Sequence, residues 1–159
     1  MKYLLLITLL GFIFYSCFAK QGKEISNNPD AQSDRNLNNK MGRNKMKITI
    51  GSYTFMAILH DNKTTEALKA LLPLSLNMSE LNGNEKYYQL STDLPTNAIS
   101  IGTIHEGDLL LWESNTLVVF YKTFPTSYQY TKIGRIENPE GLAAAVGSGN
   151  VTINFNLIY

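Results

Sequence analysis

The stretch 108-DLLLWESNTLVVFYK-122 decides how this chain folds. Its two apolar runs, 109–112 and 117–121, are rich in leucine, valine and aromatic residues, and Ser114-Asn115 lies between them as a tight turn. Short runs that are apolar on both faces are typical of central strands. We therefore expect two adjacent strands that are covered by other parts of the chain on both sides.

Shorter signals surround this stretch. The alternating segment 47–50, the turn Gly51-Ser52 and the segment 53–59 predict a hairpin. Further strands are expected at 86–90, 108–113, 117–122, 128–136 and 151–157. Two short helices are expected at 64–72, capped by Asn62 or Thr64 and stopped by Pro73, and at 139–146, ending before Gly147. This pattern predicts a mainly β fold, a closed β-barrel whose ends two short helices cap.

The N-terminus has the features of a secretion signal. Lys2 precedes an apolar run over 3–15, which is shorter than the roughly 20 residues that a membrane span needs. Cys17 follows the small residue Ser16, and this arrangement resembles the lipobox of bacterial lipoproteins. The resemblance implies a signal peptide over 1–16, acylation of Cys17 as the first mature residue, and a lipid anchor in a bacterial membrane of the cell envelope. The alternative is cleavage after Ala19, which would release a soluble secreted or periplasmic protein.

The next segment, 17–45, is polar and basic. It carries 6 basic and 3 acidic residues, whereas the part from Met46 onward carries 7 basic and 10 acidic residues. Its few apolar residues show no period, so we expect a disordered tether before one domain at 46–159. An acidic domain argues against a nucleic-acid partner.

Cysteine and histidine usage restricts the chemistry further. One cysteine excludes a disulfide framework and a cysteine-rich metal site. The two histidines, His60 and His105, lie beside turns with no spacing that requires a shared metal ion. Gly147-Ser148-Gly149 precedes a strand instead of opening a helix, so it lacks the arrangement of a phosphate-binding loop. No cofactor and no metal are predicted.

The order of these elements resembles the cyclophilin fold. The segment 87-YYQL-90 is similar to the aromatic-x-Arg-aliphatic strand of cyclophilins, and 133-IGRI-136 is similar to their Phe-Gly-x-Val segment. The chain more closely resembles a bacterial cyclophilin-like domain family of undefined function. This resemblance covers most of 46–159, over the segments 72–90, 94–112, 118–122, 127–136 and 147–155.

The resemblance implies an activity, and Gln89 departs from the pattern at the residue that the activity uses. Cyclophilins rotate a prolyl peptide bond, whose barrier is about 18–20 kcal/mol, with an apolar proline pocket and an arginine that donates to the twisting amide. Gln89 stands at the position of that arginine, and a neutral amide lacks the charge that strengthens such a bond. Arg135, the domain's one arginine, lies in a different segment.

Aromatic residues offer a candidate binding groove. Alternation places Tyr128 and Tyr130 on one face, and two interpretations remain open: a cross-strand ladder in the core, or a groove for an extended peptide or a small apolar ligand. The candidate groove residues are Gln89, Trp112, Phe120, Tyr121, Tyr128 and Tyr130.

These observations favour a membrane-tethered, non-catalytic cyclophilin-like binding domain for a peptide or small ligand. The alternatives are a weak peptidyl-prolyl isomerase that uses Gln89 and the groove, and a structural lipoprotein of the envelope whose groove is filled by its own side chains.

Overall fold

The computed structural model describes residues 44–158. The expected signal peptide, the lipidation site Cys17 and nearly all of the expected tether lie outside these residues. The elements, in chain order, are β1 (Lys45–Ile50), β2 (Tyr53–Leu59), α2 (Lys63–Leu71), β3 (Leu74–Leu81), β4 (Glu85–Gln89), β5 (Ile99–Ile104), β6 (Asp108–Trp112), β7 (Thr116–Phe120), β8 (Phe124–Ile136), α3 (Leu142–Val146) and β9 (Val151–Leu157).

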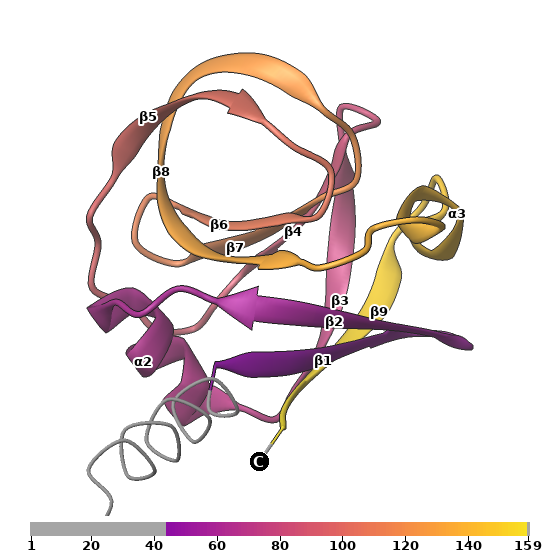
Figure 1. The fold of residues 1–159 in the computed structure, drawn as a ribbon, viewed down its shortest axis with the longest axis horizontal. Helices are drawn as coiled ribbons and strands as arrows, with labels where there is room; N and C mark the ends of the chain where they lie inside the picture. Colours follow the sequence, from indigo (N-terminus) through magenta and orange to yellow (C-terminus); the bar gives the residue numbers. More distant parts are fainter. Residues whose placement is uncertain (1–43, 159) are drawn as a thin grey trace, which may run out of the picture.

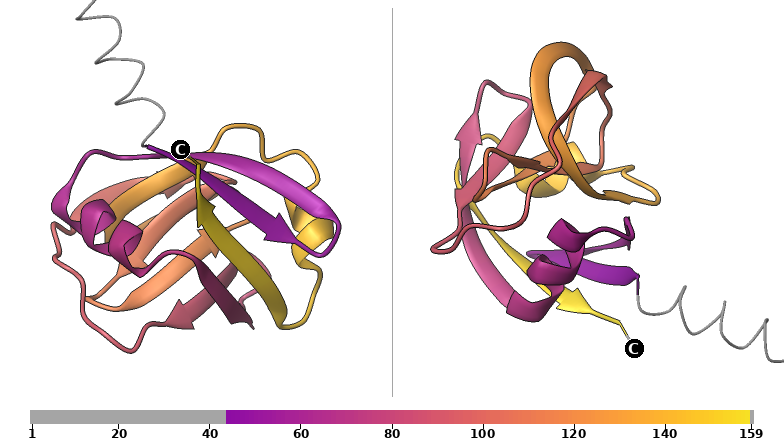
Figure 2. Two further views of the ribbon diagram at one scale, coloured as in Figure 1. Left: turned by 90° about the horizontal axis from the view of Figure 1, so that it is seen from below. Right: turned by 90° about the vertical axis from the view of Figure 1, so that its left-hand side faces the viewer.

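The strands form one closed ring. Their order is β2-β1-β9-β3-β4-β7-β6-β8-β5, and β2 also pairs with the second half of β8. β5 stands outside the ring because it pairs with the first half of β8, which curls over β6 and β7 (Figure 1). The helices α2 and α3 lie at opposite sides of the ring (Figures 1 and 2). The mainly β prediction with two short helices is therefore confirmed.

Local sequence explains where the helices begin and end. The side chain of Asn62 accepts a hydrogen bond from the Thr65 N–H at 2.8 Å and so caps α2. The helix stops before Pro73, and Leu68 on its inner side is buried. α3 begins at Leu142, three residues later than expected, because its N-cap, Gly141, has a left-handed backbone (φ 84°) that interrupts a helix starting at Pro139.

The interior is divided into two apolar clusters on the two faces of β4, β7 and β6. The first core fills the ring and includes Leu109, Leu111 and Val119; the second core lies between these strands and the curled part of β8, and includes Leu110, Val118 and Phe120. Every residue of β7 is buried. The prediction that this segment is covered on both sides is thus confirmed, and its two coverings are two different cores.

Two strands were not predicted. β3 alternates as a strand should, with Leu76 and Met78 buried, but its serine, asparagine and glutamate residues resemble a loop composition. β5 is an outer strand whose residues are mostly exposed, so it lacks the apolar alternation that reveals a strand. β8 also begins at Phe124, four residues before the predicted start at Tyr128.

Candidate functional site

Two of the six predicted groove residues lie in one row on the sheet. Gln89 of β4 and Trp112 of β6 both pair with Thr116 of β7, and they share the face that carries the second core. Gln89 is exposed and Trp112 is 42% exposed, while Thr116 between them is buried. At the position that resembles the cyclophilin arginine, the end of β4 thus carries a neutral, solvent-accessible amide.

Two further predicted residues belong to the second core. The Phe120 ring lies 5.7 Å from Tyr130 in an edge-to-face arrangement and 5.8 Å from Phe124, measured between centroids. Phe120 is fully buried and Tyr130 is 6% exposed. These rings fill the space between the sheet face and the curled part of β8, as the core interpretation of the aromatic residues predicts.

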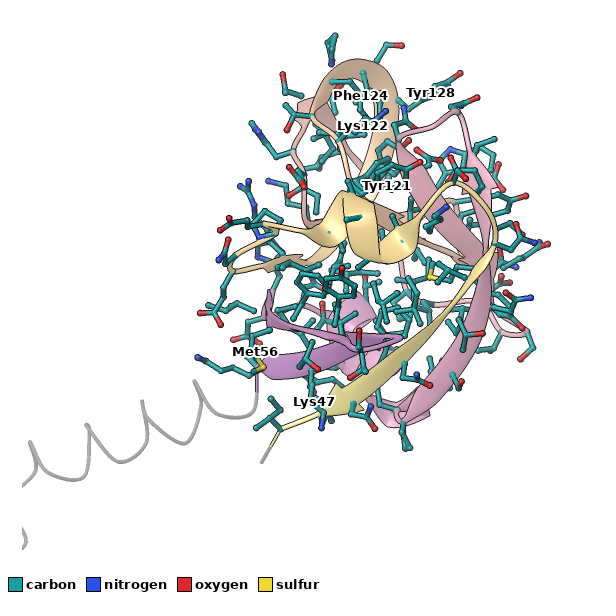
Figure 3. All side chains as sticks on the ribbon, turned by 90° about the vertical axis from the view of Figure 1, so that its right-hand side faces the viewer. Lys47, Met56, Tyr121, Lys122, Phe124 and Tyr128 are labelled. Carbon is teal, nitrogen blue, oxygen red and sulfur yellow. The ribbon has the colours of Figure 1, made fainter. Side chains whose placement is uncertain are left out.

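The remaining two lie elsewhere. Tyr121 points away from Phe120, packs with the first core and donates a hydrogen bond to Glu80 at 2.8 Å. Tyr128 is 65% exposed on the curled part of β8, above Tyr121 in the view of Figure 3. The six predicted side chains therefore do not line one groove: the structure divides them between a rim, two cores and an exposed surface.

A buried lysine lies at the centre of a polar cluster. The ammonium of Lys86, which is completely buried, donates to Glu80, to the carbonyl of Gly147 at 2.9 Å and to the carbonyl of Gly149 at 2.6 Å. It also lies 5.4 Å from the centroid of the Tyr121 ring. All three N–H bonds of the ammonium are thus occupied, so Lys86 ties the β3–β4 hairpin to the loop before β9 and is no free nucleophile.

This arrangement changes the pKa values of the acidic groups around Lys86. Burial alone would raise the pKa of Glu80, but hydrogen bonds from Lys86, Tyr121 and the Gly83 N–H hold that pKa below its ordinary value. Burial, followed by the hydrogen bond to Glu80 and the negative charges of Glu80 and Glu85, raises the pKa of Tyr121 to about 12. Tyr121 therefore stays a neutral donor at physiological pH.

Glu85 has the opposite environment. It lies on the second-core side of β4, opposite Phe120, and burial together with the negative charge of Glu80 raises its pKa to about 7. Burial and the charges of Glu85 and Tyr128 raise the pKa of Tyr130 to about 12. No hydrogen bond or ion pair joins Glu85 to another side chain of residues 44–158. Nothing in the sequence distinguishes this carboxyl from the other acidic residues.

A pocket of about 280 Å³ opens elsewhere, and sequence reasoning did not identify it. We call it the β5 pocket. It lies where the β2–α2 loop, the start of β5 and the middle of β8 meet. Its lining residues are His60, Asp61 and Asn62 from the loop, Asn97 and Ile99 at β5, and Thr131 and Lys132 from β8.

Hydrogen bonds hold the walls of the β5 pocket in place. The Asn62 amide donates to the Lys132 carbonyl at 2.8 Å, and the Asn97 N–H donates to the Thr131 hydroxyl oxygen at 2.9 Å. Thr64 and Thr65 of α2 donate to the carbonyls of Pro95 and Ile133. These bonds join all three walls, so the pocket is formed before any ligand arrives.

The two histidines lie in different parts of the fold. His60 lines the β5 pocket, whereas the backbone of His105 belongs to the turn before β6, where its N–H donates to Asp108. Within residues 44–158, no three histidine, cysteine, aspartate or glutamate side chains gather as a metal ion would require. In the same part of the chain, no helix is both long and apolar enough to cross a membrane.

Comparison with known proteins gives a family match and a match to a solved structure. A sequence model described as the cyclophilin-like family matches residues 48–156. The solution structure of the hypothetical protein AF2241 from Archaeoglobus fulgidus is similar with a TM-score of 0.50 and 17% identity, over 73% of this chain and 95% of that chain. No curated protein matches.

Proposed function

Because this chain belongs to the cyclophilin-like family, we propose that residues 46–159 are a non-catalytic binding domain for a peptide or small ligand. A lipid on Cys17 would hold this domain at a bacterial membrane. The observation that carries the proposal concerns the sheet face on which Gln89 lies. This face presents a neutral amide and buried apolar side chains where an isomerase needs an arginine and an open pocket.

A prolyl isomerase of this fold would need an arginine and an open apolar pocket on that face. Gln89 supplies a neutral amide, and Arg135 lies on β8, where its Nε is 3.7 Å from Asp108. On the same face, the neighbouring β7 residues Val118 and Phe120 are buried in the second core. Both requirements of the isomerase reaction are therefore poorly met, which supports binding over catalysis.

A coupled proline-isomerisation assay tests this proposal. We expect the purified chain to leave the rate at the uncatalysed background, and Gln89→Ala to change nothing. Turnover by the wild-type chain that disappears in Gln89→Ala would overturn the proposal in favour of the isomerase.

The membrane anchor rests on the Ser16-Cys17 junction alone. Several acyl chains on one cysteine would anchor the protein stably, since each buried CH₂ contributes about 0.8 kcal/mol. Mass spectrometry of the mature protein should find a lipidated N-terminal cysteine, and Cys17→Ser should release the protein from the membrane fraction. A mature N-terminus at Lys20 would show instead that the protein is released.

A further inference from the structure

We propose that the ligand is an extended peptide segment, which enters the β5 pocket and continues along the free edge of β5. This inference rests on the proposed binding function and identifies its site and its ligand class. Neither the pocket nor the edge belongs to the predicted aromatic groove.

The unused polar groups of the pocket suit a peptide backbone. Among residues 44–158, the carboxamide of Asn97, the imidazole of His60 and the hydroxyl proton of Thr131 make no hydrogen bond to another protein group. The carboxamide and the imidazole each offer both a donor and an acceptor, as a peptide bond does. Thr131 is 2% exposed, so its unused proton is a buried donor for a carbonyl.

Charge and size agree with this ligand class. One lysine and one aspartate line the pocket, so its formal charges cancel and favour neither an anion nor a cation. A volume of about 280 Å³ approaches the lower end of small-ligand pockets, which is about 300 Å³. It exceeds what an inorganic ion needs and suits one or two peptide residues. Ile99, 44% exposed at the rim, offers an apolar surface to one side chain.

Ile99 lines the pocket and is also the first residue of β5, so the free edge of β5 begins next to the pocket. β5 ends the strand order, so one of its edges pairs with β8 and the other edge meets no described strand. Ile99 and Ser100 are both exposed. A free edge of this kind accepts an extended peptide as an additional strand, with backbone hydrogen bonds providing affinity.

The usable edge is short. The pairing of β5 with β8 shifts register between Ser100 and Gly102, and Gly102 has a positive φ of 75°. Such a bulge ends regular pairing and protects the rest of the edge from other strands. The added strand is thus restricted to the residues next to the pocket, so a peptide would be recognised by both features together.

Amide spectra of the ¹⁵N-labelled full chain test the inference, with a pool of N-acetylated, C-amidated pentapeptides bearing uncharged side chains as the probe. We expect shifts at Asn97, Ile99, Ser100 and Thr131, together with slower hydrogen exchange at one or more of residues 99–101. The signals of the Trp112 indole N–H and the Gln89 amide should not shift.

A variant pair measures the contribution of the pocket. Asn97→Ala should weaken binding about fivefold, the loss expected for about one hydrogen bond. Asn77→Ala, at an exposed position on β3, is the matched control and should bind as the wild type does. Equal affinity of the two variants, or no shift with the pentapeptide pool, would overturn the inference.

The outcomes also separate this inference from the function on which it rests. Shifts at Gln89 and Trp112 alone, or binding of monosaccharides or short carboxylic acids without peptides, would overturn the inference and leave a binding domain. Isomerase turnover that depends on Gln89 would overturn the proposed function, whatever the pentapeptides do at the β5 pocket.

Discussion

Replacing Glu85 by glutamine should stabilise the protein above neutral pH and have little effect in acid. The folded protein raises the pKa of this carboxyl from an ordinary 4.5 to about 7, because burial and the charge of Glu80 disfavour its ionised form. The unfolded chain releases the proton near the ordinary value. Stability is therefore lost as the pH rises from about 4.5 to about 7, and the loss is complete above that range.

The size of the effect follows from the shift. A difference of this size corresponds to at most about 3 kcal/mol of folding free energy. The side chain is only partly buried, so solvent screening reduces the expected value to about 1–2 kcal/mol. Glutamine keeps the shape of the protonated acid, and Glu85→Gln should recover most of this free energy.

Urea unfolding at about pH 4 and about pH 8 provides the assay, since a cooperative transition yields the free energy of unfolding at each pH. Glu140→Gln, at an exposed position, is the matched control. We expect the free energy of unfolding of Glu85→Gln to exceed that of the wild type at the higher pH only. The free energy of unfolding of Glu140→Gln should match that of the wild type at both pH values. An equal gap between Glu85→Gln and the wild type at both pH values would refute the reasoning.

Three further substitutions test the packing. Lys86→Met should cost about 3–5 kcal/mol in urea unfolding, because it leaves Glu80 without its cation; a smaller cost in the Glu80→Gln background would confirm the pairing. Gly134→Ala should lower the melting temperature by several degrees, since a Cβ there would lie 2.5 Å from a carbonyl oxygen of β2; an unchanged melting temperature would contradict this close approach. Asn62→Ala should cost about 1 kcal/mol through loss of the α2 cap, and calorimetry showing no change would contradict that role.

Most of the ring could be predicted because its strands carry strong local signals. β6 and β7 are apolar on both faces, and β9 alternates with Ile153 and Phe155 buried. β5 and the first part of β8 could not be predicted equally well, because they cover a second, smaller core and expose much of their length. The sequence pattern of one strand does not indicate whether another strand will cover it.

The polar features were harder to predict for a related reason. Lys86 is buried because its partners are carbonyls of Gly147 and Gly149, which are far away in sequence. Groups of the β5 pocket come from three separate segments, and only the folded chain brings them together. The aromatic residues were recognisable as a set, but alternation alone could not assign Phe120 and Tyr121 to different cores. That any of the six predicted groove residues contacts a ligand stays a prediction.

The position of β9 has a consequence for the order of events when the chain is made. β9 inserts between β1 and β3, and it is the last of the described strands to leave the ribosome. Until it arrives, β1 and β3 each lack a neighbour, and the carbonyls that receive the Lys86 ammonium are not yet present. The ring of strands therefore cannot close until β9 has been synthesised, so its closure depends on pairings between segments that are far apart in the sequence.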